Sequence, residues 1–177
     1  QIAALYNLNF ASLETEKVCH NLLVNNSCAV LFGMDGNVYE FLNDKFSQIT
    51  IYSQVSILTE YFSVQSRPVH LKQMFVNLRT NFIDLYCYDR GFILLNNSYV
   101  CSSMADSSYS IRYVWKQLGM DKQNDELYIV NHTKSPNDEL IAMLGKFVRK
   151  ISVLSGQQYD SSDFDTQMQP FDMRSLL

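Results

Sequence analysis

Three residues of this sequence could take part in chemistry, and each lies within or beside a segment with the pattern of a β-strand. Asp84 carries a carboxylate inside the run 82–88, Arg79 carries a guanidinium in the polar break before that run, and His132 follows the apolar segment 126–130. A carboxylate could hold a metal ion, a guanidinium could bind an anion, and an imidazole could transfer a proton. No second acid is identifiable beside Asp84, so we interpret it as a polar residue on a partly exposed face. A lone histidine in a loop is more often a solvated residue than a catalytic one, and anion binding by Arg79 is the ligand hypothesis that we keep.

The rest of the sequence offers no alternative catalytic machinery. It contains no P-loop, paired-carboxylate, metal-ligand or nucleophile motif. The four cysteines, Cys19, Cys28, Cys87 and Cys101, have no metal-like spacing, and we predict buried free thiols in a reducing compartment.

The composition is that of a soluble globular chain. Its 177 residues are 47% hydrophobic and 18% charged, and the longest apolar runs have the length of a strand, which argues against a transmembrane segment. The formal net charge is -4 and the lysines and arginines are scattered along the sequence, so we predict no basic face and no nucleic acid partner. We expect a cytoplasmic protein.

The segment 72–99 organises the chain. Apolar and polar residues alternate with a period of two in KQMFVNL, FIDLYCY and GFILLNNSY, which predicts three consecutive strands. A polar break at Arg79-Thr80-Asn81 separates the first two strands. The turn Asp89-Arg90-Gly91 separates the second and third, and Gly91 can supply the positive φ that a tight hairpin needs.

Helical spacing follows the meander. Apolar residues over 106–118 predict a helix that ends at Gly119, with a core-facing stripe of Tyr109, Tyr113 and Trp115. The later predicted elements are a strand over 126–130, a helix with Ser135 as N-cap and Pro136 at its first position, a strand over 150–154, a mobile loop over 156–169 and a short last helix.

The first part of the chain also alternates between helix and strand. The predicted elements are a helix after Ser12, a fully buried strand over 28–32, a helix after Asp35, a strand over 48–52 and a helix over 53–64. The opening 2–10 is a possible helix remnant. A hairpin turn at Asp35-Gly36 is the alternative for the third element, and we prefer the helix because its polar face is coherent.

This order of elements predicts an α/β fold with a mixed sheet covered by helices on both faces. Three antiparallel strands followed by helix, strand, helix and strand are the ribonuclease-H-like order on which actin-like ATPases are built. We expect residues 1–68 to be the remainder of a first actin-like half and residues 69–177 to be the second, ribonuclease-H-like subdomain. The chain begins with Gln1 rather than Met, so we expect part of the N-terminal lobe to be missing.

Three stretches of the chain resemble a bacterial family. They are FIDLYCYDRGFILLNNSY, YSIRYVWKQLGMDKQNDELYIV and ELIAMLGKFVRKISVL. The family is of unknown function, occurs in Bacteroidetes-type organisms and has an actin-like fold, and the resemblance covers most of the chain from Cys28 to Leu154. An actin-like ATPase holds its nucleotide between two glycine-containing hairpins, each with an Asp near the metal, and a Gly-Gly turn admits the adenosine.

The resemblance places the nucleotide-binding positions on residues that lack these features. The second phosphate hairpin falls on 77–81, with Asn77 where the metal-side Asp would be, Arg79 where the phosphate-side Gly would be, and Thr80 beside it. The adenosine turn falls on Asn131 and His132, where glycines would be. Side chains at these positions fill the space that a phosphate and a purine need.

We therefore expect a degenerate, non-catalytic scaffold or interaction module with a protein partner and no cofactor. Its oligomeric state stays open. The alternative is a working ATPase that binds ATP and Mg, with its remaining phosphate loop upstream of residue 1. A third possibility is that the cleft binds some other anion through Arg79.

Overall fold

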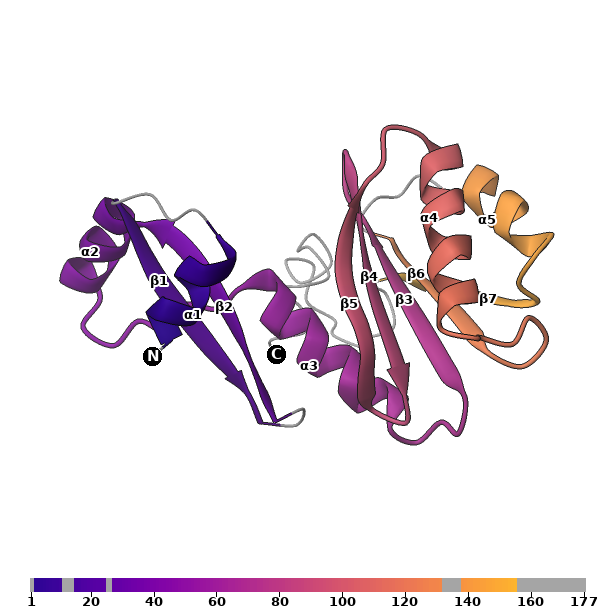
Figure 1. Cartoon of the computed structure of the whole chain (residues 1–177), viewed down its shortest axis with the longest axis horizontal. Helices are drawn as coiled ribbons and strands as arrows, with labels where there is room; N and C mark the ends of the chain where they lie inside the picture. Colours follow the sequence, from indigo (N-terminus) through magenta and orange to yellow (C-terminus); the bar gives the residue numbers. More distant parts are fainter. Residues whose placement is uncertain (1, 11–14, 25–26, 132–137, 156–177) are drawn as a thin grey trace, which may run out of the picture. The chain divides into compact units, whose positions relative to one another are not determined.

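The computed structural model describes residues 2–10, 15–24, 27–131 and 138–155 (Figure 1). The chain divides into two compact units, Gln1–Glu60 and Tyr61–Leu177, and the division falls inside helix α3 (Gln54–Ser66). We predicted a boundary at residue 68, and the assignment of the units to two actin-like halves stays a prediction.

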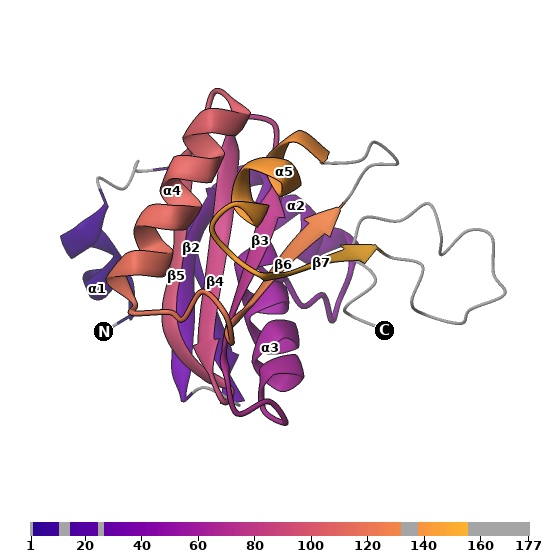
Figure 2. The same cartoon turned by 90° about the vertical axis from the view of Figure 1, so that its right-hand side faces the viewer.

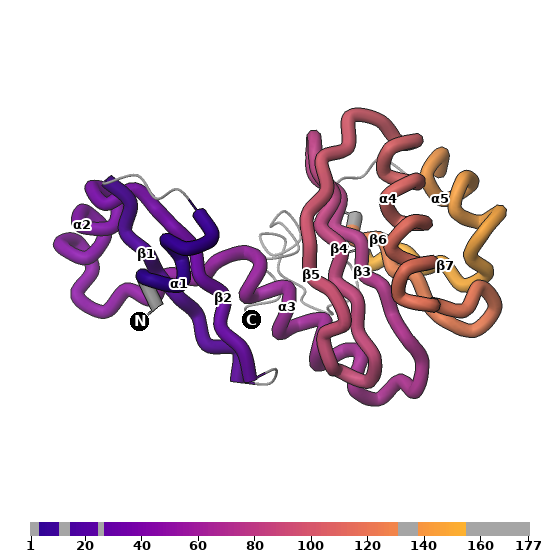
Figure 3. Tube along the Cα trace, in the orientation of Figure 1, coloured from indigo at the N-terminus to yellow at the C-terminus, as the bar shows by residue number. Residues whose placement is uncertain are grey.

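The first unit is built around a two-stranded antiparallel sheet. Its elements are α1 (Ile2–Asn9), β1 (Glu16–Leu23), β2 (Cys28–Asp35), α2 (Gly36–Lys45) and the first part of α3. The two strands run side by side (Figure 3). Glu16 pairs with Asp35 at one end of the sheet and Leu23 pairs with Cys28 at the other.

Asp35 caps α2, as predicted. Its Oδ1 accepts hydrogen bonds from the backbone N–H groups of Asn37 at 2.9 Å and Val38 at 3.1 Å. Gly36 donates its own N–H to the carbonyl of Thr15, and a Cβ at Gly36 would lie 2.8 Å from that oxygen. The hairpin alternative at Asp35-Gly36 is wrong, because the chain enters a helix there.

Three predictions for the first unit are wrong. The segment after Ser12, expected as a helix, forms β1, because pairing with β2 outweighs its helical spacing. No residue of β2 is fully buried, because a strand with a single neighbour cannot be covered like the centre of a large sheet. The segment 48–52 is irregular instead of a strand. The side chain of Asn21 hydrogen-bonds to the backbone of this region instead of a neighbouring strand. Its Nδ2 donates to the carbonyl of Ile51 at 2.8 Å, and its Oδ1 accepts from the N–H of Ser53 at 2.9 Å.

The second unit contains a five-stranded mixed sheet with the order β5-β4-β3-β6-β7. Its elements after α3 are β3 (Lys72–Leu78), β4 (Phe82–Asp89), β5 (Phe92–Val100), α4 (Met104–Gln117), β6 (Glu126–Asn131), α5 (Asp138–Gly145) and β7 (Lys150–Ser155). Strands β3, β4 and β5 are antiparallel neighbours, whereas β3, β6 and β7 run parallel. The predicted meander and the ribonuclease-H-like order are confirmed.

Helices cover both faces of this sheet (Figure 2). On one face, α4 and α5 bury an apolar core with the sheet, in which Val76, Leu85, Ile129 and Trp115 are fully buried. On the other face, Phe62 of α3 stacks on Phe75 of β3 with ring centroids 4.3 Å apart. Phe75 also stacks on Tyr128 of β6 at 5.0 Å, so an aromatic layer forms the centre of this second face.

The turn between β4 and β5 has the predicted conformation. Gly91 has φ 84° and Arg90 has φ 52°, so both central residues of this two-residue loop are left-handed, as a type I′ hairpin requires. A Cβ at Gly91 would lie 2.5 Å from Cγ of Arg67, which is a second reason for glycine here.

The aromatic stripe of α4 is only partly in the core. Trp115 is fully buried, but Tyr109 is 70% exposed and Tyr113 is 50% exposed. The two tyrosines are one turn apart and stack on each other, with centroids 6.3 Å apart and ring planes at 17°. The prediction that all three are core residues is therefore wrong for the tyrosines, because the helix turns them to the side opposite Ile111 and Val114.

The cysteines also differ from the prediction in part. Cys87 and Cys101 are buried free thiols, whereas Cys19 is half-buried and Cys28 is exposed. The predicted N-cap at Ser135 and Pro136, the mobile loop and the last helix lie outside the described residues. None of the described helices is long and apolar enough to cross a membrane.

Candidate functional site

A buried carboxylate lies at the centre of the candidate site. In the register of the sheet, Asp84 of β4 pairs with Asn77 of β3 on one side and with Ser98 of β5 on the other. The Oγ of Ser98 donates to Oδ1 of Asp84 at 2.6 Å, and Nδ2 of Asn77 donates to Oδ2 at 3.0 Å. Asp84 is only 2% exposed, so the interpretation of this residue as partly exposed is wrong.

Arg79 lies over this carboxylate from the hairpin between β3 and β4. Its NH1 is 3.7 Å from Oδ1 of Asp84, and its guanidinium lies 5.8 Å from the ring centroid of Phe82. The side chain is 50% exposed, so the ion pair is partly screened and contributes on the order of 0–1 kcal/mol. The guanidinium also places a positive charge beside the buried carboxylate.

The hairpin that carries Arg79 needs no glycine. The backbone N–H of Arg79 donates to the carbonyl of Phe82 at 2.9 Å, which leaves Thr80 and Asn81 as the exposed tip. Neither tip residue has a positive φ. The turn is therefore formed by ordinary residues, and its tip is occupied by side chains rather than by bare backbone amides.

The chemistry of this cluster is limited by its own hydrogen bonds. Each oxygen of Asp84 accepts one hydrogen bond, and the guanidinium of Arg79 lies 3.7 Å from Oδ1, so the carboxylate has a partner on both oxygens. A search of the described ranges finds no group of three or more His, Cys, Asp or Glu residues that could hold a metal ion. The arrangement is that of a buried carboxylate whose hydrogen-bonding needs are met.

The predicted second half of the site lies at the same edge of the sheet. Asn77 pairs with Val130 of the parallel strand β6, so the carboxyl ends of these strands meet, and the backbone of Asn131 continues beside them to pair with Ser155. His132 lies outside the described residues. The structure thus brings Asn77, Arg79 and Asp84 together.

Sequence reasoning missed Ser98, and a β-bulge explains why. The tight turn pairs Asp89 with Phe92, and the same register continued along the hairpin would place Asn97 opposite Asp84. A register shift between Cys87 and Tyr88 inserts one unpaired residue in β5 and brings Ser98 to this position instead. No residue type in the sequence signals that bulge.

A second polar cluster lies at the opposite ends of the strands. Tyr128 donates its hydroxyl to Oε2 of Glu126 at 2.8 Å, and Nε2 of Gln73 donates to the same oxygen at 2.8 Å. Burial, together with the hydrogen bond to Glu126, raises the pKa of Tyr128 to about 12. The phenol is therefore neutral at physiological pH, and the cluster offers a hydrogen-bond network rather than a general base.

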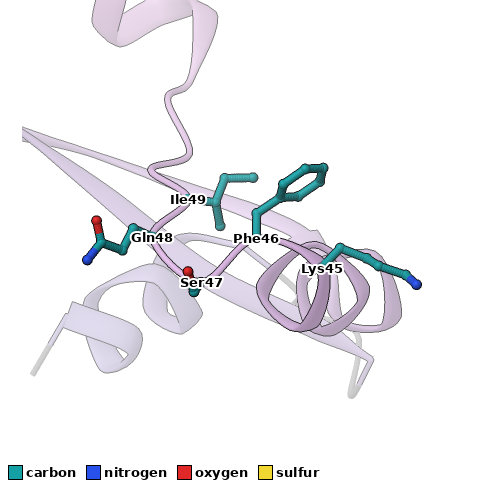
Figure 4. Close-up of a pocket in the computed structure, with 5 residues that line it drawn as sticks. All are labelled: Lys45, Phe46, Ser47, Gln48 and Ile49. Atoms are coloured by element: carbon teal, nitrogen blue, oxygen red, sulfur yellow. The ribbon is translucent and has the colours of Figure 1, made fainter.

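The hollow drawn in Figure 4 belongs to the first unit and carries no catalytic group. It measures about 560 Å³ and is lined by the consecutive residues 45–49 after α2. These residues include no acid and no histidine, and the side chain of Lys45 points away along the end of the helix.

Comparison with protein families identifies the group to which the chain belongs. A family described as "Protein of unknown function (DUF3822)" matches residues 1–151. This chain is a member of the DUF3822 family. Among curated proteins, none matches it.

A solved structure supports the same fold. The crystal structure of a Bacteroides thetaiotaomicron protein with actin-like ATPase fold and unknown function is 34% identical, with a TM-score of 0.82 over 99% of this chain and 64% of that one. This DUF3822 member therefore has an actin-like ATPase fold, and it spans less than two thirds of that relative's length. An exopolyphosphatase from Cytophaga hutchinsonii is 15% identical over 48% of this chain and 34% of that one, and its TM-score of 0.36 is too low to indicate a shared fold.

Proposed function

We propose that this chain is a non-catalytic actin-like module that acts as a scaffold or interaction domain. One observation carries the proposal: both oxygens of Asp84 are already hydrogen-bonded, and the guanidinium of Arg79 is the nearby cation. A phosphate-binding hairpin of the ATPase type would need free amides and a carboxylate open to a metal at this edge of the sheet.

Asn77 supports the proposal because its side chain is uncharged. Magnesium prefers carboxylate oxygens, and an amide at this position contributes no negative charge to attract it. The Nδ2 of Asn77 is committed to Asp84 at 3.0 Å. The positive charge of Arg79 at the same edge would also repel a divalent cation.

A cytoplasmic location and a protein partner complete the proposal. The described cysteines are free thiols, and two of them are buried, which fits a reducing compartment. An actin-like fold without a nucleotide site retains its surfaces, and binding another protein is the role that such surfaces can still perform.

Titration calorimetry of the full-length natural protein with Mg-ATP tests the proposal. We expect no saturable heat at millimolar nucleotide, and a micromolar dissociation constant would establish the ATPase alternative instead. Arg79→Ala reports on anion binding, and Arg67→Ala is the control, since Arg67 is an exposed arginine beside Gly91, at the other end of the β3–β4–β5 meander. A thermal shift with inorganic phosphate that is lost only in Arg79→Ala would reveal an anion site.

A further inference from the structure

Five cations that are scattered in the sequence gather on one surface of the second unit, which we call the basic surface. They are Arg112 and Lys116 of α4, Lys122 of the connector to β6, and Lys146 and Arg149 of the connection from α5 to β7. All five are exposed. The fold brings α4 and both connections together (Figure 2), so cations that are scattered in the sequence lie on one surface.

Contacts around Phe147 fix the centre of the basic surface. The Nζ of Lys122 lies 4.5 Å from the ring centroid of Phe147, and Cζ of Arg112 lies 5.3 Å from it. The backbone N–H of Arg149 donates to the carbonyl of Lys122 at 3.0 Å, and its NH1 donates to Oε1 of Gln123 at 3.1 Å. These contacts restrict the side chains of Arg112, Lys122 and Arg149.

The carboxylates nearby do not neutralise these charges. Asp125 is only 7% exposed and accepts hydrogen bonds from backbone N–H groups. Glu126 has its own partner, since its Oε1 lies 3.9 Å from Nζ of Lys150. Asp121 is exposed, and backbone N–H groups of the connector hydrogen-bond to it and lower its pKa. Of these three acids only Asp121 is exposed, so they offset little of the charge of the five cations.

Aromatic side chains extend the basic surface along α4. Tyr109 and Tyr113 are 70% and 50% exposed, and they share one helical side with Arg112 and Lys116, at spacings of three, four and seven residues. Exposed tyrosine and arginine are the residue types that contribute most to binding at protein interfaces. The surface therefore offers charge and apolar contact together.

We propose that the basic surface binds an acidic segment of a partner protein, with an aromatic or aliphatic side chain of that segment against the tyrosines. A nucleic acid fits the surface less well, because its phosphates would continue beyond the five cations over a chain whose net charge is -4. A short acidic peptide carries its charge only where the cations are. This inference rests on the proposed interaction role and is independent of the nucleotide cleft.

Fluorescence anisotropy tests the inference with a labelled glutamate-rich peptide that contains a phenylalanine. We expect binding that weakens with salt, and we expect Lys122→Glu to raise the dissociation constant about tenfold. Lys45→Glu is the matched control, because it reverses a cation that also lies over an aromatic ring, 6.0 Å from Phe41, in the other unit. It should leave the dissociation constant unchanged within about twofold. Lys146→Glu replaces Lys122→Glu if that variant does not fold.

Three results would overturn the inference. One is no binding of the acidic peptide, and another is equal weakening by Lys122→Glu and Lys45→Glu, which would indicate a diffuse effect of net charge. The third is tighter binding of an oligothymidylate than of the peptide. The Mg-ATP titration does not involve this surface, so a failure here and a failure of the non-catalytic proposal are distinguishable.

Discussion

Replacing Asn77 by aspartate would test the hydrogen-bond network around Asp84. In the wild type, Nδ2 of Asn77 donates to Oδ2 of Asp84 at 3.0 Å, and both residues are almost completely buried. The substitution keeps the shape of the side chain and exchanges this donor for a carboxylate oxygen. The folded protein must then hold two negative charges in contact or take up a proton between them.

The size of the effect follows from this separation. Two unit charges about 3 Å apart repel by about 5.5 kcal/mol at an effective dielectric constant of about 20. A shared proton removes the repulsion, and adding it to an ordinary aspartate at pH 7 costs about 4 kcal/mol. The smaller value sets the penalty, so we expect Asn77→Asp to lose about 4 kcal/mol of unfolding free energy at pH 7. Because the folded variant binds the extra proton, the loss should shrink by about 1.4 kcal/mol for each unit by which the pH falls towards 5.

Urea unfolding followed by circular dichroism at pH 7 and pH 5 measures this loss. Asn97→Asp is the control, because Asn97 is exposed on the neighbouring strand β5 and its Oδ1 already accepts a hydrogen bond from the backbone N–H of Ser98. It should change stability by less than about 0.5 kcal/mol at either pH. A variant at position 77 as stable as wild type at pH 7, or a loss that does not depend on pH, would refute the description of the site.

Other positions allow simpler tests. Gly91→Ala should lower the unfolding free energy by more than about 1 kcal/mol in a thermal melt, because Gly91 has φ 84° and a Cβ there would lie 2.5 Å from a side-chain carbon. Gly145→Ala, where a Cβ meets nothing within 4 Å, should be neutral or stabilising, and equal losses in both would contradict this. The pKa of Tyr128 rises from 10.0 to about 12, chiefly through burial, so its contribution to stability is complete below pH 10 and is lost as the pH rises towards 12. Unfolding free energies of wild type and Tyr128→Phe should therefore converge over that window, and parallel pH profiles would speak against it. Burial raises the pKa of Cys87 to about 12, so a thiol reagent should modify exposed Cys28 first and Cys87 only on unfolding, as peptide mass spectrometry would detect.

The sequence predicts the second unit well because local patterns decide it. The meander alternates cleanly, Gly91 marks a turn that requires positive φ, and Gly119 ends α4 with φ 58°. The first unit is predicted less well. The segment after Ser12 has helical spacing but forms β1, and a side chain of that strand, Asn21, determines the conformation of residues 51–53. Such long-range partners leave no local signal.

The sequence predicts only part of the candidate site, because long-range pairing decides the rest. Asn77 and Arg79 lie where the resemblance places the phosphate hairpin, and the charge of Asp84 marks it in the sequence. Its burial depends on Ser98, which the bulge brings into register. The basic surface could not be predicted either. Its cations lie far apart in the sequence, and only the packing of α4 against the two connections brings them together.

The bulge in β5 has a consequence for the length of that strand. The hairpin at Arg90-Gly91 fixes where β5 starts. Deletion of one residue at 93–95 would remove the bulge and leave Ser98 opposite Asp84, whereas insertion of one residue there would exchange the two faces of everything that follows. Tyr99 would then turn away from the apolar core. Asn97, in place of Ser98, would lie opposite Asp84 and would have to donate the hydrogen bond to its carboxylate. The spacing of this hairpin is as decisive for the protein as the identity of its residues.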